Sequence, residues 1–250
     1  MIAVPTIVQA TVGQILPVRR FVGLLALAAS PGVLVFLVTG RPDAEDSLDA
    51  FAGITVGLFF GVVLPIVTLI LATSSLGDER RDSTLSFIVL KPIPRSMIAL
   101  AKIIASLAAS AAVLIPGAVL LGVARGVRNG EWEFILPLVI SGVIGSAVYA
   151  SLFTPLGYLT QRATLIGLAY VFLWEGAVSG AVTALATTSA WRIGFSAFAA
   201  MVPAEITELV GEFALGPVAP GVGGAIVKAV AVILVSSLLT TWILQARDLA

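Results

Sequence analysis

The side chains that could carry acid–base or metal chemistry are few in this sequence and unevenly placed. Its 250 residues include 14 Lys and Arg, 14 Asp and Glu, and neither His nor Cys. That composition excludes Cys/His zinc sites, His-dependent nucleophilic dyads and imidazole acid–base catalysis. The sequence also has no Gly-x-x-x-x-Gly-Lys-Ser/Thr run, which is the loop that binds nucleotide phosphates in one large class of hydrolases. We therefore expect no catalytic residues, no metal site and no cofactor in this chain.

The densest group of charges is the stretch DERRDSTLSFIVLKPIPRSM, residues 78–97, between two long apolar runs. Asp82 or Ser83 can cap a short helix there. Pro92 and Pro94 then force an extended exit. The pattern predicts a short amphipathic element joined at both ends to apolar helices, which suits the transmission of force from a soluble domain. An interfacial loop whose basic side chains reach lipid headgroups is the alternative.

Glu175 is the one clear acid within an apolar run. A charge at that depth in a bilayer is costly, so the side chain should face protein, a water-filled cavity or a partner charge such as Arg192. It could line a translocation path or close an outer gate. Alternatively it is hydrogen-bonded and holds a neighbouring segment in place, which is the interpretation we favour. A single acid makes no proton relay.

The elements that must position these residues are membrane helices. Hydrophobic residues make up 59% of the chain, only 11% of residues are charged, and the mean hydropathy is +1.10, which is typical of a polytopic membrane protein. Runs of about 20 apolar residues predict transmembrane helices. Six are expected, at residues 21–38, 51–75, 97–123, 134–159, 163–185 and 224–244. The class is all-α, with one transmembrane domain over residues 1–250 and short re-entrant or surface helices on the outer face at 186–222.

Basic residues predict the orientation of these spans, because they concentrate in cytoplasmic loops. With both termini inside, the inner bases are Arg19, Arg20, Arg80, Arg81, Lys91, Arg95, Lys102, Arg162 and Arg247, and the outer ones are Arg41, Arg125, Arg128, Arg192 and Lys228. The excess inside indicates an N-in, C-in topology. The loop at residues 76–96 then faces the cytoplasm and carries most of the cytoplasmic polarity between spans.

The sequence GDERRDSTLSFIVLKPIPRSMIALAKIIA, residues 77–105, resembles the signature of exporter-type ABC permeases, the type-2 ABC transporter membrane subunits. Within that family it is similar to the copper-maturation and gliding-motility permeases. The matching positions are Glu79, Arg80, Arg81, Ser83, Thr84, Leu85, Lys91, Pro92, Arg95 and Lys102. Ser83 departs from the Gly that is commonest there. The span plan and YVFLWEG at residues 170–176 add to the resemblance.

The resemblance implies a membrane subunit that is driven by a separate ATP-binding cassette subunit, present in two copies, which binds ATP and Mg. The loop at 76–96 would be the coupling helix, with Glu79, Arg80, Arg81, Ser83, Thr84, Leu85, Lys91, Pro92 and Arg95 forming the ATPase-coupling site. A second permease subunit, identical or paralogous, is also implied, in the cytoplasmic membrane of a prokaryote. Membrane lipid and a protein outside the cytoplasm are further expected partners, and nucleic acid is not.

Residues 1–20 would form an amphipathic elbow helix at the inner surface. Ile7, Val8, Thr11, Ile15 and Leu16 recur at helical spacing there, with Gln9 and Gln14 on the other side. Gly-x-x-x-Gly motifs at Gly53, Gly57 and Gly61, and at Gly176 and Gly180, let helices approach closely. We interpret each motif first as packing within one subunit, and second as contact between subunits.

Two other functions compete with an ATP-driven exporter. An ion-gradient-driven carrier usually shows inverted repeats and midplane charges, but the sequence has no convincing repeat and only Glu175 at depth. An intramembrane enzyme would need several polar residues converging in the bilayer, and Ser, Glu and Asp do not cluster in that way. The transported substrate cannot be read from the sequence.

Overall fold

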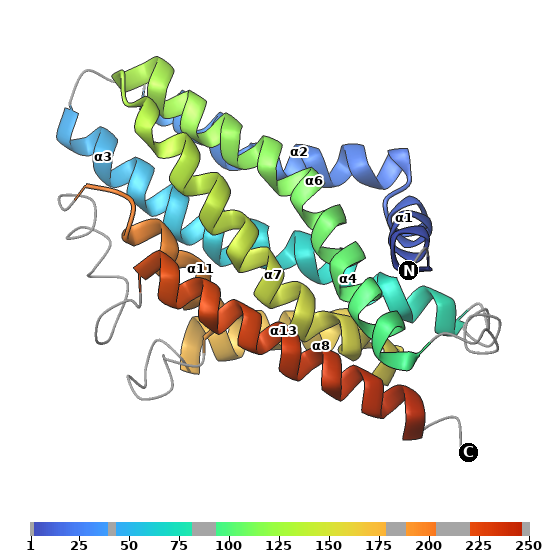
Figure 1. Cartoon of the computed structure of the whole chain (residues 1–250). Helices are drawn as coiled ribbons and strands as arrows, with labels where there is room; N and C mark the ends of the chain where they lie inside the picture. The colour runs from blue at the N-terminus through green and yellow to red at the C-terminus, as the bar shows by residue number, and fades with distance from the viewer. Residues whose placement is uncertain (1–2, 40–43, 82–93, 179–188, 204–220, 247–250) are drawn as a thin grey trace.

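The structure, a computed structural model, describes residues 3–39, 44–81, 94–178, 189–203 and 221–246. All regular elements in these ranges are helices. Figure 1 shows the long helices side by side with roughly aligned axes, and the first short helix at a steep angle to them at one end. We call this the basic end, defined by Arg20, Arg80, Arg81 and Arg95. The opposite end holds the connection between the third and fourth long helices.

Five helices are long and apolar enough to cross a membrane. They are Val18–Val38, Ser47–Arg81, Arg95–Asn129, Trp132–Leu159 and Gly221–Ala246. The first is α2 (Val18–Val38), and the second comprises the end of α3 (Ala44–Gly53), the π-helical η1 (Ile54–Val63) and α4 (Leu64–Arg81). The others are α6 (Arg95–Asn129), η2 (Trp132–Phe134) with α7 (Ile135–Leu159), and α13 (Gly221–Ala246). These five helices coincide with the predicted spans one to four and six.

The predicted fifth span, residues 163–185, is present in part. Helix α8 (Ala163–Ala169) continues into the π-helical η3 (Tyr170–Val178). These 16 residues would cover about 24 Å at 1.5 Å per residue, less than the ~30 Å of a hydrocarbon core. Residues 179–185 lie outside the described ranges, so a complete crossing by this fifth segment stays a prediction.

Helices α4 and α6 are longer than their predicted spans. Residues 76–81 and 95–96 of the predicted loop are helical, because α4 continues through Asp78 to Arg81 and α6 begins at Arg95. Basic side chains at a helix C-terminus are favourable for the helix dipole. With 35 residues each, the helix that ends in α4 and the helix α6 are about 50 Å long, so both extend beyond the hydrocarbon core.

At two prolines inside the spans, hydroxyl groups bind the carbonyls that the prolines leave without a donor. Pro31 cannot donate to the carbonyl of Leu27, and the hydroxyl of Ser30 donates to it instead, at 2.8 Å. Pro155 likewise frees the carbonyl of Ser151, which accepts the hydroxyl of Ser236 from α13. Helix α2 therefore continues across Pro31, and α13 is joined to α7.

Helix α7 lies at the centre of the bundle and packs against α4, α6, α11 (Ala190–Ala199) and α13. Single glycines allow the closest crossings. A Cβ atom at Gly157 of α7 would overlap the carbonyl oxygen of Thr73 in α4, and one at Gly117 of α6 would overlap that of Ala28 in α2. Backbones therefore touch at these crossings, which is how small residues promote helix association in lipid.

The glycines that the sequence selected are not at these crossings. A Cβ atom at Gly53 or Gly57 would meet no atom within 4 Å in the described part of the chain, and one at Gly61 would approach only the carbonyl of Val56. Packing within the subunit is therefore the wrong interpretation for Gly53 and Gly57. The motif was misread because spacing does not tell which face of a helix is covered. Contact with a second subunit stays a prediction.

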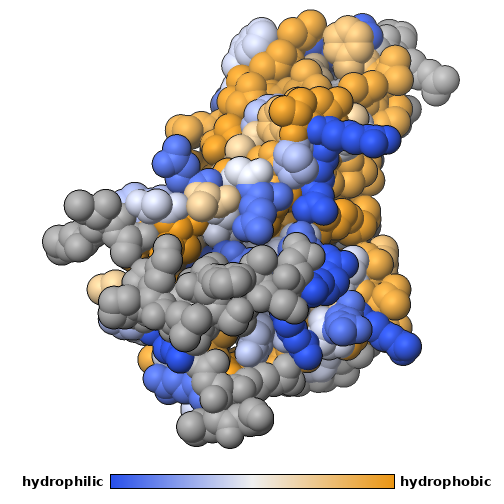
Figure 2. All heavy atoms as spheres, turned by 90° about the vertical axis from the view of Figure 1, so that its right-hand side faces the viewer, coloured by the Kyte–Doolittle hydropathy of each residue, from blue (hydrophilic) through white to orange (hydrophobic). Residues whose placement is uncertain are grey.

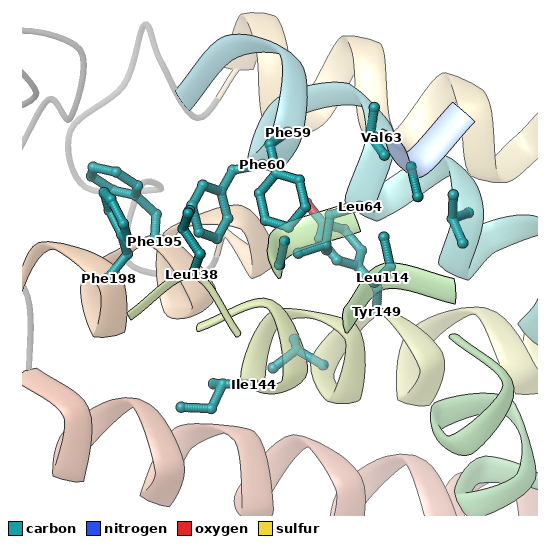
Figure 3. Close-up of a cluster of buried hydrophobic side chains, with 14 of the residues drawn as sticks. Phe59, Phe60, Val63, Leu64, Leu114, Leu138, Ile144, Tyr149, Phe195 and Phe198 are labelled. Carbon is teal, nitrogen blue, oxygen red and sulfur yellow. The ribbon is translucent and has the colours of Figure 1, made fainter. Parts of the chain in front are cut away.

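A buried aromatic cluster lies toward the opposite end, where η1 meets α11. The ring of Phe60 packs against Phe195 and Phe198, with centroids 5.9 and 5.6 Å away, and Phe195 stacks on Trp191. Figure 3 shows Phe60, Phe195 and Phe198 between the ribbons of η1, α7 and α11. The predicted outer segment 186–222 thus contains a short helix that is buried in the core. Residues 186–188 and 204–220 lie outside the described ranges.

Much of the remaining surface is apolar. Only 17% of the apolar window of α13 and 28% of that of α2 is buried, and large apolar side chains cover their outer faces. Figure 2, which views the basic end, shows apolar side chains over the upper part and hydrophilic ones gathered below them. Exposed apolar area of this extent fits contact with lipid.

Candidate functional site

In the part of the chain that the structure describes, the charged side chains at the end of α4 form two connected groups and one separate contact. All three depend on the last turns of α4, which carry Asp78, Glu79, Arg80 and Arg81 in sequence. Successive residues on a helix point about 100° apart, so four neighbours face different elements. As a result, α4 contacts α1 (Ala3–Ile15), α2, α6 and α7 through this one segment.

The first group is a buried ion pair between Lys102 of α6 and Glu79 of α4. The side chains are almost fully buried, at 1% and 5% exposure, and the Lys102 ammonium also donates to the hydroxyl of Thr11 in α1 at 2.8 Å. A charge in such surroundings is stable only when it is paired and hydrogen-bonded. The three side chains, which we call the α1–α4–α6 clamp, therefore fix three elements to one another.

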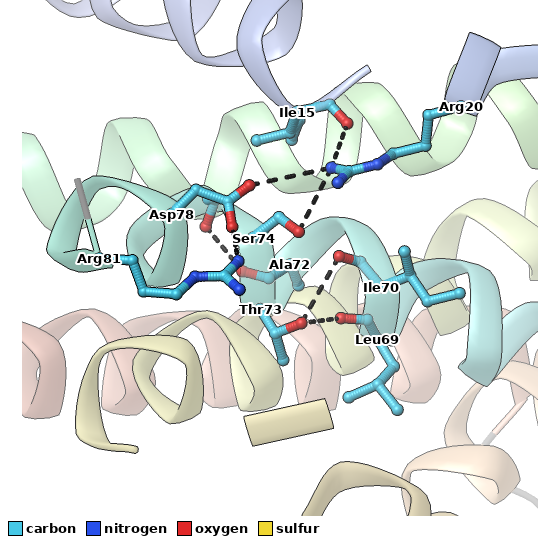
Figure 4. A network of polar contacts seen from close by, with 10 residues as sticks. Ile15, Arg20, Leu69, Ile70, Ala72, Thr73, Ser74, Asp78 and Arg81 are labelled. Carbon is cyan, nitrogen blue, oxygen red and sulfur yellow. Dashed lines mark hydrogen bonds and ion pairs between the residues drawn. The ribbon is translucent and has the colours of Figure 1, made fainter. Parts of the chain in front are cut away.

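The second group surrounds Asp78. Arg20, at the start of α2, donates to the carbonyl of Ile15 at 2.9 Å and to the hydroxyl of Ser74 at 3.4 Å, and lies 3.9 Å from the Asp78 carboxylate. Arg81 pairs with the same carboxylate. Figure 4 shows Arg20 reaching across from α2 to α4. Since the Ile15 carbonyl ends α1, this arginine caps that helix and holds the bend between α1 and α2.

The separate contact joins α4 to α7. Nη1 of Arg80 donates to the carbonyl of Tyr158 at 2.6 Å, and the guanidinium lies 5.8 Å from the centre of the Tyr158 ring. The carbonyls in the last turn of a helix have no partner within the helix. Arg80 therefore satisfies one of them at the end of α7 and anchors α4 there.

The predicted ATPase-coupling residues occupy different positions. Glu79 is buried in the clamp, Arg80 and Arg95 are half-buried, and Arg81 is exposed. Ser83, Thr84, Leu85, Lys91 and Pro92 lie outside the described residues. The sequence assigned Glu79, Arg80 and Arg81 to one coupling site, but of these three the structure exposes only Arg81.

The elbow helix predicted at residues 1–20 is helical from Ala3 to Ile15, and its predicted faces are confirmed. Thr11 and Ile15 are buried, whereas Gln9 and Gln14 are exposed. This helix packs on α6 and α4. Its role as an elbow at the inner membrane surface stays a prediction.

Glu175 lies on η3 and binds the start of α11. Its carboxylate accepts hydrogen bonds from the backbone N–H of Ala190 at 2.8 Å, from the phenol of Tyr170 at 2.9 Å, and from the hydroxyl of Ser189. Helix N-termini have unpaired N–H groups and attract negative charge. This geometry agrees with the structural interpretation, in which Glu175 holds the outer segment. A role in a translocation path or gate is untested.

Sequence reasoning missed a buried arginine at the opposite end. Arg125 of α6 is 2% exposed and makes a two-pronged pair with Glu131, at 2.9 and 3.1 Å. Its Nη1 also donates to the carbonyl and the hydroxyl of Ser47, and its guanidinium lies over the ring of Phe51. This arginine ties α3 to α6 and to the turn that follows it. The sequence signal for this pair was a basic residue, Arg125, and an acidic residue, Glu131, six positions apart on either side of Gly130.

In the ranges that the structure describes, no group of three or more Asp and Glu side chains is arranged to hold a metal ion. The geometry instead defines a polytopic helical membrane protein whose charges join helices at the two ends of the bundle. The family model described as ABC-2 family transporter protein matches residues 19–175, more than half of the chain. The chain therefore belongs to the ABC-2 transporter family and is an ABC transporter permease with transmembrane helices. A search of curated proteins found no significant match.

Proposed function

We propose that the chain is the membrane subunit of an ATP-driven exporter and that a separate ATP-binding cassette subunit docks at its basic end. Membership of the ABC-2 family supports the ATP-driven class. The bases at this end support its cytoplasmic placement, by the positive-inside rule, with both termini inside. In this proposal two copies of the ATP-binding subunit supply ATP and Mg, and a second permease, identical or paralogous, completes the complex in a prokaryotic cytoplasmic membrane.

The α1–α4–α6 clamp carries the mechanistic part of the proposal. Residues 82–93 connect the end of α4 to the start of α6, and the clamp joins these helices on either side of that connection. Force applied to the connecting segment reaches α4 and α6 together, and α1 moves with them. A buried ion pair suits this role, because its partners resist separation in a low-dielectric environment.

Among the described residues of the predicted ATPase-coupling site, Arg81 is the one best placed for docking. Its side chain is 62% exposed and its pairing with Asp78 holds it at the surface. Glu79 instead acts through the clamp as a positioning residue, and Arg80 through α7. Ser83, Thr84, Leu85, Lys91, Pro92 and Arg95 complete the proposed docking region.

Co-purification with the ATP-binding subunit tests the docking. The variant Arg81→Glu reverses an exposed charge, and we expect it to lower recovery of the ATPase about tenfold, equal to about 1.4 kcal/mol. Arg128→Glu is the matched control, since Arg128 is an exposed arginine at the opposite end. Unchanged recovery with Arg81→Glu, or equal loss with the control, would show that the ATPase does not dock there. An exporter activity that persists without any ATPase would favour the carrier instead.

A further inference from the structure

A polar cavity opens at the basic end, on the side of α4 away from α1. Its volume is about 270 Å³, several times the ~30 Å³ that a water molecule occupies in the liquid. The lining comes from the end of α4, the end of α7 and the start of α8. It consists of Thr73, Ser74, Gly77, Arg80, Arg81, Gly157, Thr160, Gln161, Ala163 and Thr164.

The floor of the cavity is peptide backbone. Thr73, Gly157 and Ala163 are buried, and a Cβ atom at Gly77 would lie 3.1 Å from the carbonyl of Gly157. The two glycines bring α4 and α7 together and leave space above the crossing. Arg81, Gln161 and Thr164 are exposed, so the cavity opens to the surroundings of the protein.

The wall is positively charged and rich in donors. The lining holds Arg80 and Arg81 and no acid. A guanidinium has five N–H donors, and the contacts described above use one terminal nitrogen each of Arg80 and Arg81. Asp78 offsets one of these charges. Hydroxyls of Ser74, Thr160 and Thr164 add further donors, so the site favours an anion with several acceptor oxygens.

We propose that this cavity binds the phosphate of an anionic headgroup, and that the source is a lipid of the surrounding bilayer. Arginine and hydroxyl groups are the usual ligands of phosphate in proteins. The cavity lies where α4 and α7 end and α8 begins, which is the level of headgroups for helices that cross the hydrocarbon core. Basic pockets between membrane helices at this level bind such headgroups. The inference does not depend on ATPase docking.

Lipid retention by the purified full chain, without any ATP-binding subunit, tests the proposal. Native mass spectrometry would compare phosphatidylglycerol with zwitterionic phosphatidylcholine at equal concentration. We expect preferential retention of phosphatidylglycerol, weakened about five- to tenfold by Arg80→Gln and by Arg81→Gln. Arg80→Lys keeps the charge and should retain most of the binding. Arg162→Gln is the matched control, because Arg162 is exposed at the same end but does not line the cavity.

A second arm separates the two sources of phosphate. Inorganic phosphate and glycerol 3-phosphate would be added to the chain in detergent, with the thermal unfolding midpoint as the readout. A rise that Arg81→Gln abolishes, without selective lipid retention, would support the phosphate site and assign it to a soluble ligand. The proposal would be overturned if neither phosphatidylglycerol nor the soluble phosphates bind, or if Arg162→Gln weakens binding as much as Arg81→Gln does. Since no ATPase is present, these outcomes are distinct from failure of docking.

Discussion

The variant Lys102→Met removes the ammonium of the clamp and keeps a side chain that packs well in apolar surroundings. The Glu79 carboxylate, whose side chain is 5% exposed, would lose its ammonium, and the Thr11 hydroxyl would lose its donor. Breaking a buried pair from one side costs about 3–5 kcal/mol, because a charge is left in a low-dielectric site. We therefore expect the free energy of unfolding to fall by about 4 kcal/mol.

The double variant Glu79→Gln/Lys102→Met distinguishes pairing from general packing. Both charges are removed together, so the stability of this variant should lie within about 1–2 kcal/mol of the wild type. Replacing a buried ion pair by uncharged groups often changes stability little. The coupling energy from the double-mutant cycle should then exceed about 2 kcal/mol. Additive effects, or a loss under about 1 kcal/mol in each single variant, would refute the reasoning about the clamp.

Unfolding in mixed detergent micelles with increasing dodecyl sulfate, followed by tryptophan fluorescence, provides the measurement. The chain contains four tryptophans, of which Trp132 lies in the connection between α6 and α7 and Trp191 stacks on Phe195 of the aromatic cluster, both at the opposite end. Arg81→Met is the matched control. Its pair with Asp78 is largely exposed, at 62% for the arginine, so its loss should cost at most about 1 kcal/mol.

Three further perturbations test other contacts. Glu175→Gln removes the charge at the start of α11 and should lower the opening free energy of residues 190–199 by about 1–2 kcal/mol, measured by hydrogen exchange. Gly157→Val places a side chain against the Thr73 carbonyl and should prevent normal packing of α4 on α7, measured as loss of monodisperse protein in size-exclusion chromatography, whereas Gly53→Val should be tolerated. Arg125→Met should cost about 2 kcal/mol, because the buried carbonyl and hydroxyl of Ser47 lose their donor; a loss below about 0.5 kcal/mol would contradict this.

The span pattern was predictable because it depends on composition alone. Long apolar runs with charges at their ends predicted the helices of spans one to four and six. The amphipathic pattern of residues 3–15 predicted the buried face of α1. The helix ends near Arg81 and Arg95 were less predictable. Charged residues at the end of a span can continue the helix into the headgroup region, so the apolar run in the sequence ends before the helix does.

Contacts between helices were not predictable, because they depend on rotation and crossing that one sequence does not encode visibly. Lys102 entered the sequence reasoning only as an inner base and as a position of the family signature, although a lysine seven residues into a helix that spans the membrane requires a partner. Its partner, Glu79, was assigned to a docking surface. The same limit explains Gly53 and Gly57, whose spacing suggested packing, whereas isolated Gly117 and Gly157 make the close crossings.

The distribution of charge along α4 connects the two proposals. Its last turns point Glu79 toward α1 and α6, Arg80 toward α7, and Arg81 outward, so one short segment meets the clamp, the cavity and the surface. Movement of this segment by a docked ATPase would shift Arg80 and Arg81 together with the clamp. An anionic headgroup held by the same arginines would then bind with different affinity before and after this movement of α4. A ligand biases a conformational equilibrium only through such a difference in affinity. Lipid composition should therefore alter the coupling of ATP hydrolysis to transport, and it should do so less in Arg81→Gln than in the Arg162→Gln control.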